Sequence, residues 1–175
     1  MKHDIDFNYY TETYLGKVGE LTLKGGNMRV FEKQLVLNLR LALETVEARV
    51  WTQAGRLYVS CTKDSVLAAE YALDRLIGIT GWAKVRVVEK TMEAIRAAVA
   101  EEGKAAVASG AKTFKIDARR EDKSFALNSY EICSGAAGVL FDDGTMSVDV
   151  HNPDVVINVE VRDKCYVYCA QRKTC

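Results

Sequence analysis

A strict two-residue alternation constrains the fold of this chain more than any other feature of its sequence. Apolar and polar residues alternate over Phe114, Lys115, Ile116, Asp117, Ala118 and Arg119. Because successive side chains of a strand point to opposite faces, this pattern predicts a strand with one face on a core and one polar face. A helical pattern precedes it, with Met92, Ile95, Val99 and Ala106 on one side and Gly110 as its stop. A helix followed by a half-buried strand is typical of an α/β layer.

The residues after this strand predict one more helix and three more strands. Asn128 and Glu131 resemble a capping box at the start of the helix. Its apolar face is Ile132, Ala136, Val139 and Leu140. Strands are expected at residues 146–150, 155–162 and 165–169. The second half of the chain therefore has the expected order α-β-α-β-β-β.

The first half of the chain predicts the order β-α-β-β-α-β, the split unit of ferredoxin-like folds. Strands are expected at residues 13–18, 46–53, 56–61 and 82–88, with a hairpin turn at Ala54-Gly55. Asn27 is a candidate N-cap for a helix that ends near Glu44, and Asp64 is a candidate cap for a second helix. The expected class is α+β, with α/β sandwiches at residues 1–88 and 89–175.

Charge and composition limit the classes of function. The chain has 24 basic and 24 acidic residues, so an RNA-binding role would need local clustering of cations. The N-terminal segment lacks the apolar core of a signal peptide, and no apolar run is long enough to cross a bilayer. We therefore expect a cytoplasmic protein with no membrane partner. Its five cysteines are then expected to be free thiols.

The sequence offers little support for catalysis or metal binding. It has no glycine-rich nucleotide-binding motif. Its two histidines, His3 and His151, fall near the chain start and beside a turn, where histidines are usually solvated. Cys165 and Cys169 would share a strand face about 13 Å apart, too far for one zinc ion. We expect no catalytic residue, metal or cofactor in this chain.

The main candidate site is a group of cations on one strand and the loop that leaves it. Its members are Lys112, Lys115, Arg119, Arg120 and Lys123. Phosphates require cations at this density with small polar donors nearby, and Ser124 and Asn128 supply such donors. The alternative is a solvated face that Glu121 and Asp122 partly neutralise.

A second group of cations surrounds a glycine pair near the first helix. Its members are Lys17, Lys24, Arg29 and Lys33. Gly25 and Gly26 would let backbone approach a ligand closely. The alternative is a simple turn before a helix.

Several of these segments resemble, in order, a known family. Residues 19–27, followed by Phe31-Glu32, resemble the Gly-Glu-x-x-Leu-Lys-Gly-x-Asn signature that opens tRNA 4-thiouridine synthetases, or tRNA sulfurtransferases. Residues 114–120, 122–125 and 129–132 resemble the core of the THUMP domain of that family. Residues 148–150, 152–154 and 159–162 are similar to its closing strands. The resemblance covers almost the whole chain.

The resemblance implies a ferredoxin-like domain followed by a THUMP RNA-binding domain. In this family the pair docks the acceptor stem and 3′ tail of tRNA, and a separate ATP-pyrophosphatase domain adenylates uridine 8 for sulfur transfer. We expect that catalytic domain to be missing here, so ATP, Mg and a sulfur-donor protein are expected only for a full-length enzyme. The motif maps RNA binding onto Arg119, Arg120 and Lys123, with Lys24 and Asn27 in the first signature. A homodimer and a role in thiamine synthesis stay open.

Two departures and two alternatives accompany this interpretation. Ala126 replaces a usual proline, and Met28 replaces a frequent arginine. One alternative is the front end of another THUMP enzyme, such as a tRNA methyltransferase, which would not be expected to carry the Lys-Gly-Gly-Asn signature. The other is a ferredoxin-like module for a small molecule or protein partner, which would need an apolar pocket and an uncharged face.

Overall fold

The computed structural model describes residues 5–19, 27–53, 55–142, 144–169 and 172–173. These residues form two compact units. Unit 1 holds the described residues up to Val85 together with a short strand near the C-terminus, and unit 2 covers Arg86–Ala170. The mixed α+β class predicted from the sequence is confirmed.

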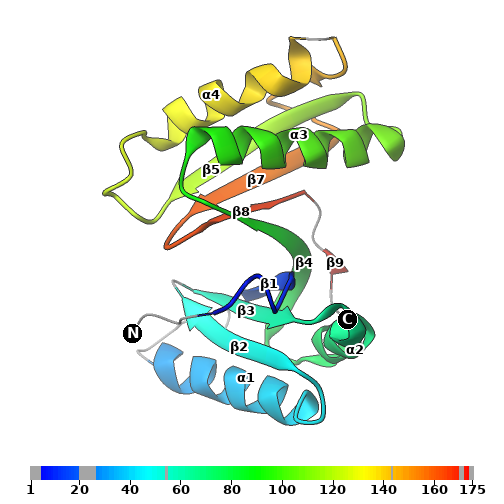
Figure 1. Cartoon of the computed structure of the whole chain (residues 1–175), viewed down its shortest axis with the longest axis vertical. Helices are drawn as coiled ribbons and strands as arrows, with labels where there is room; N and C mark the ends of the chain where they lie inside the picture. The colour runs from blue at the N-terminus through cyan, green and yellow to red at the C-terminus, as the bar shows by residue number, and fades with distance from the viewer. Residues whose placement is uncertain (1–4, 20–26, 54, 143, 170–171, 174–175) are drawn as a thin grey trace. The chain divides into compact units, whose positions relative to one another are not determined.

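Unit 1 is an antiparallel sheet with two helices (Figure 1). Its strands are β1 (Glu12–Val18), β2 (Ala48–Gln53), β3 (Arg56–Cys61) and β4 (Ile79–Val88), in the spatial order β2-β3-β1-β4. The short strand β9 (Arg172–Lys173) pairs with β4. The helices are α1 (Met28–Ala42) and α2 (Val66–Arg75), with a 3₁₀ turn η2 (Lys63–Ser65) before α2. The predicted order β-α-β-β-α-β is therefore confirmed.

The core of unit 1 lies between its helices and one face of its sheet. Leu35 and Leu39 of α1 and Leu73 of α2 pack with Leu57 and Val59 of β3, and all five are fully or almost fully buried. This is the arrangement that a helical apolar stripe and an alternating strand require.

Several boundaries in unit 1 differ from the sequence prediction, among them the start of β2, at Ala48 instead of residue 46. The prediction that Asp64 caps the second helix is wrong: Asp64 lies inside η2, and Ser65 precedes α2. Strand β4 begins at Ile79, earlier than the predicted Trp82. The reason is that Gly78, with a φ of 114°, makes the turn, and the chain is already extended after it.

Unit 2 is a mixed sheet with two helices (Figure 1). Its elements are α3 (Met92–Ala108), β5 (Thr113–Arg120), α4 (Ser129–Phe141), β6 (Ser147–Val148), β7 (Val155–Val161) and β8 (Cys165–Tyr168). The last residues of β4 also belong to its sheet, whose spatial order is β4-β8-β7-β5-β6. The predicted order α-β-α-β-β-β is confirmed.

The alternation predicted for β5 is present in the structure. Phe114 and Ile116 are buried, while Asp117 and Arg119 are exposed. Ile132, Ala136 and Leu140 of α4 are buried, as expected, and Val139 is partly buried. Helices α3 and α4 pack closely at Gly103, where an added Cβ would overlap the side chain of Leu140.

Strand directions in unit 2 bring three segments to one end of its sheet. β5 is parallel to β7, and β8 is antiparallel to both β7 and β4. β4, β5 and β7 therefore run in the same direction, and all three end at one edge. The segments that follow them are residues 89–91, 121–128 and 162–164.

None of the helices that the structure describes has the length and apolarity needed to traverse a bilayer.

Candidate nucleic-acid interface

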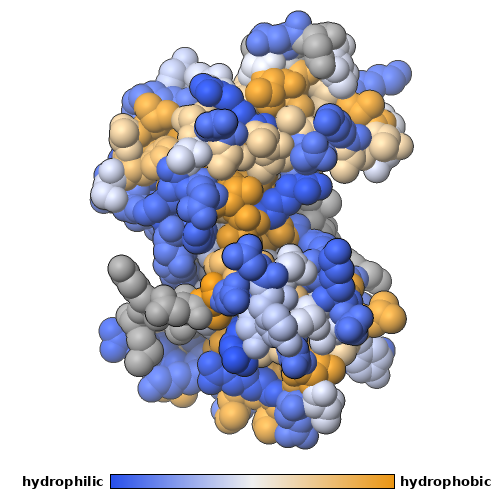
Figure 2. All heavy atoms as spheres, in the orientation of Figure 1, coloured by the Kyte–Doolittle hydropathy of each residue, from blue (hydrophilic) through white to orange (hydrophobic). Residues whose placement is uncertain are grey.

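Cations gather where these three segments meet. We call this end of unit 2 the basic edge and define it by Lys90, Arg119, Arg120, Lys123 and Lys164. Figure 2 shows hydrophilic residues over much of this end on the visible face. Four carboxylates lie in or beside the same segments, those of Glu89, Glu121, Asp122 and Asp163. Because the charges nearly balance, any anion binding there must depend on which cations are exposed and how they are held.

The loop between β5 and α4 is ordered by its own hydrogen bonds. Asp122 accepts at Oδ1 from the backbone N–H of Ser124 (3.0 Å) and from its hydroxyl (2.5 Å). The N–H of Phe125 donates to the Asp122 carbonyl at 3.2 Å, and the N–H groups of Glu121 and Asp122 donate to the Val161 carbonyl. The loop is therefore preformed, and Lys123 is exposed within it.

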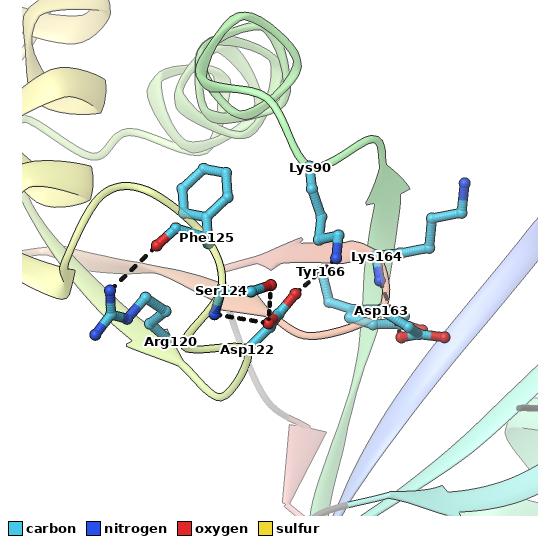
Figure 3. A network of polar contacts seen from close by, with 8 residues as sticks. All are labelled: Lys90, Arg120, Asp122, Ser124, Phe125, Asp163, Lys164 and Tyr166. Atoms are coloured by element: carbon cyan, nitrogen blue, oxygen red, sulfur yellow. Dashed lines mark hydrogen bonds and ion pairs between the residues drawn. The ribbon is translucent and has the colours of Figure 1, made fainter. Parts of the chain in front are cut away.

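Arg120 holds the same loop from the side of the core. It has the strand parity of Phe114 and Ile116, so it points to the opposite face from Arg119. Its Nη1 donates to the carbonyls of Phe125 (3.2 Å) and Leu127 (3.4 Å). Figure 3 shows the guanidinium turned toward Phe125. Arg120 is half-buried and acts first as a clamp on the loop.

An ion pair fastens the loop to the segment before α3. Lys90 Nζ lies 2.6 Å from Asp122 Oδ2 (Figure 3). Hydrogen bonds from Lys90 and Ser124 hold the pKa of the Asp122 carboxyl well below its usual range, and Asp122 raises the pKa of Lys90. Lys164 makes a similar pair with Glu89 at 2.7 Å. Carboxylates of the protein itself thus partly neutralise the charges of Lys90 and Lys164.

Helix α4 begins beside this loop. Asn128 accepts at Oδ1 from the backbone N–H of Glu131 at 2.9 Å, which confirms the predicted cap. The N-terminus of a helix carries a partial positive charge, so α4 adds to the potential around Lys123.

Within unit 2, the structure brings together three of the five predicted site residues and separates the other two. Arg119, Arg120 and Lys123 lie at the basic edge. Lys115 shares a strand face with Arg119 but lies about 13 Å back along β5. Lys112 is at the opposite edge, about 23 Å from Arg119 along the strand. There its backbone N–H and that of Thr113 donate to Asp154 Oδ2, which lowers the pKa of Asp154.

Most of the first family signature, residues 19–27, lies outside the described residues. Lys24 lies outside the described residues. Asn27 precedes α1, is exposed, and makes no side-chain capping bond. Lys90 and Lys164 were not among the predicted residues, although each lies in a short segment between two elements that the sequence predicts. Only the sheet order places them beside Lys123.

The described residues offer little for catalysis. They contain no group of three or more His, Cys, Asp or Glu side chains placed to hold a metal. Burial raises the pKa of Cys165 to about 11 and that of Cys169 to about 12, so both thiols are poor nucleophiles at neutral pH. A hollow of about 450 Å³ lies at the Lys112 end of unit 2, and its lining includes Glu102 and Asp154.

Comparisons with known proteins agree with this architecture. The profile of the ThiI ferredoxin-like domain matches residues 13–85, and that of the THUMP domain matches residues 89–170. A probable tRNA sulfurtransferase of Treponema pallidum is 46% identical over 163 residues, which is 91% of this chain. The chain spans 41% of the length of that relative.

Two solved structures also resemble this chain over almost its whole length. A 4-thiouridine synthetase–RNA complex with bound ATP superposes with a TM-score of 0.78 at 26% identity, over 93% of this chain and 42% of the other. PH1313 from Pyrococcus horikoshii superposes with a TM-score of 0.80 at 29% identity, over 93% and 55%.

Proposed function

We propose a function for this chain from its family: it joins a ThiI ferredoxin-like domain to a THUMP domain and is homologous to tRNA sulfurtransferases over about 41% of their length. The proposal is that the chain is the tRNA-binding platform of such an enzyme. The THUMP domain is an RNA-binding domain. The proposed ligand is the acceptor stem and 3′ tail of tRNA, and the proposed outcome in the whole enzyme is 4-thiouridine at position 8.

The observation that carries the proposal is the preformed loop at the basic edge. Lys123 and Arg119 are exposed cations, and neither forms a salt bridge with another described residue. The loop that presents Lys123 is already fixed by Asp122 and Arg120, so little ordering entropy opposes binding. Cations and a helix N-terminus in this arrangement suit phosphate oxygens.

Phosphate contacts fix the position of an RNA without reading its sequence. In our proposal the platform recognises the shape and end of the acceptor arm, as RNA-binding modules commonly do. A catalytic domain would then meet its uridine at a fixed distance. ATP, Mg and a sulfur-donor protein belong to that domain in this proposal, and the setting would be the cytoplasm.

Fluorescence anisotropy with a labelled tRNA acceptor minihelix tests the proposal. Lys123→Ala and Arg119→Ala should each weaken binding and reduce the slope of log affinity against log salt by about 1. Lys104→Ala is the matched control, because Lys104 is an exposed lysine on α3 away from the basic edge. A helix without its 3′ tail should bind more weakly. If wild-type protein bound neither RNA, the proposal would be wrong.

A further inference from the structure

One carboxylate of the basic edge makes two separate sets of bonds. Asp122 Oδ1 accepts from the backbone N–H of Ser124 at 3.0 Å and from its hydroxyl at 2.5 Å. Asp122 Oδ2 lies 2.6 Å from Lys90 Nζ. Figure 3 shows the two oxygens directed at these two partners. One oxygen therefore holds the loop and the other holds the lysine, so the ion pair can open while the loop stays in place.

The ion pair between Lys90 and Asp122 is within reach of solvent. The exposed fractions of the two side chains are 35% and 24%. Water screens the attraction between partly exposed charges and solvates each of them when they separate, so such pairs are weak. Opening the pair therefore costs little, and an anion from solution can take the place of the carboxylate.

The pair also determines what an approaching polyanion meets. At a distance the opposite charges of Lys90 and Asp122 cancel, so this lysine adds little to the attraction of the edge for phosphates. At contact, a phosphate oxygen offers the ammonium group the same kind of charge-assisted hydrogen bond that Asp122 Oδ2 makes. The carboxylate thus occupies the position at which a phosphate would bind Lys90.

We infer that Asp122 is a built-in competitor of RNA phosphate for Lys90. In the free protein Oδ2 holds the ammonium group; when RNA binds, a phosphate replaces Oδ2 while Oδ1 keeps the loop closed. The inference rests on the proposed function, since it concerns how the same site controls its affinity for the same ligand. Its consequence is that Asp122 weakens the hold of the basic edge on RNA and so favours release.

The exchange also has a signature in the salt dependence. A phosphate that binds Lys90 releases a condensed cation from the RNA. The carboxylate that Lys90 leaves attracts a cation from solution, which offsets that release. Lys90 therefore adds little to the slope of log affinity against log salt as long as Asp122 is present.

The opposite role for Asp122 would be to position Lys90 for RNA. In that case the carboxylate would stay on the ammonium group in the complex, and its loss would weaken binding. The two roles predict opposite signs for one substitution, Asp122→Asn. The amide of asparagine keeps an oxygen for Ser124, whereas its NH₂ group cannot pair with an ammonium group.

The test measures binding of the full 175-residue chain to the labelled acceptor minihelix by anisotropy. Asp122→Asn should raise the affinity about two- to fivefold and steepen the salt slope by about 1. Glu101→Gln is the matched control. It removes the same charge and frees Lys104 from a pair at 3.2 Å on α3, away from the basic edge. Its affinity should equal that of the wild type.

A double-mutant cycle with Lys90→Ala assigns the gain to the lysine. Asp122→Asn should give no gain in the Lys90→Ala background, and any loosening of the loop by asparagine cancels because it is common to both backgrounds. Unchanged or weaker binding by Asp122→Asn, an equal gain in Glu101→Gln, or a gain that persists without Lys90 would each overturn the inference and leave the proposed function standing. Absence of RNA binding by the wild type would overturn both.

Discussion

Replacing Arg120 by alanine separates two roles that sequence alone cannot distinguish. As a phosphate ligand, Arg120 would matter only when RNA is present. As a clamp, it matters to the free protein, because its Nη1 donates to the carbonyls of Phe125 and Leu127. The structure predicts that Arg120→Ala destabilises the free protein and loosens residues 121–128, whereas Lys123→Ala does neither.

The magnitude follows from the two hydrogen bonds. A hydrogen bond to a charged group contributes about 1.5–3 kcal/mol when buried. Arg120 is only half-buried and one bond is long at 3.4 Å, so water can replace part of the interaction. We expect Arg120→Ala to lower the free energy of unfolding by about 1–2 kcal/mol. For a chain of this length that corresponds to a fall in Tm of about 3–6 °C.

Thermal unfolding and amide hydrogen exchange measure this effect. In Arg120→Ala the amides of Ser124 and Phe125, which bond to Asp122, should exchange faster. In Lys123→Ala they should exchange as in the wild type, with Tm unchanged. Wild-type stability and unchanged exchange in Arg120→Ala would refute the clamp and return Arg120 to the phosphate ligands.

Three further predictions concern stability and reactivity. Lys90 holds the pKa of Asp122 low, so the ionised Asp122 carboxylate stabilises the fold fully above the ordinary carboxyl pKa near 4. This stabilisation is lost progressively as the pH falls from there toward the lowered pKa of Asp122. The difference in Tm between wild type and Asp122→Asn should therefore shrink from pH 6 to pH 3, and a constant difference would contradict this. Gly103→Ala should lower the free energy of unfolding by about 1–2 kcal/mol in denaturant titrations, because the new methyl group overlaps a buried leucine of α4; unchanged stability would show that the leucine moves without cost. Burial raises the pKa of Cys165 to about 11 and that of Cys169 to about 12, so iodoacetamide at pH 8 should label both far more slowly in native than in unfolded protein, by mass spectrometry.

Much of the fold follows from local sequence patterns. The alternation in β5 and the helical stripes of α3 and α4 each identify an element, because burial of one face imposes its period on the sequence. Boundaries were less predictable where a glycine interrupts the pattern. Gly78 and Gly81 make residues 78–81 resemble a loop, whereas β4 already begins at Ile79.

The candidate site could be predicted only in part. The parity of β5 places Arg120 with Phe114 and Ile116, so its inward direction was present in the sequence although its partners were not. Lys90 and Lys164 join Arg120 and Lys123 only because β8 lies between β4 and β7. Pairing between distant strands has no local signature, so the composition of the basic edge required the structure.

Amide chemical-shift mapping of the ¹⁵N-labelled chain, titrated with the acceptor minihelix, tests the central claim most directly. The account predicts the largest changes over residues 119–124 and at Lys90 and Lys164, with little change at Lys112 and Asp154 on the opposite edge. Changes concentrated at Lys112 and Asp154, or no changes in unit 2, would contradict an RNA-binding role for the basic edge.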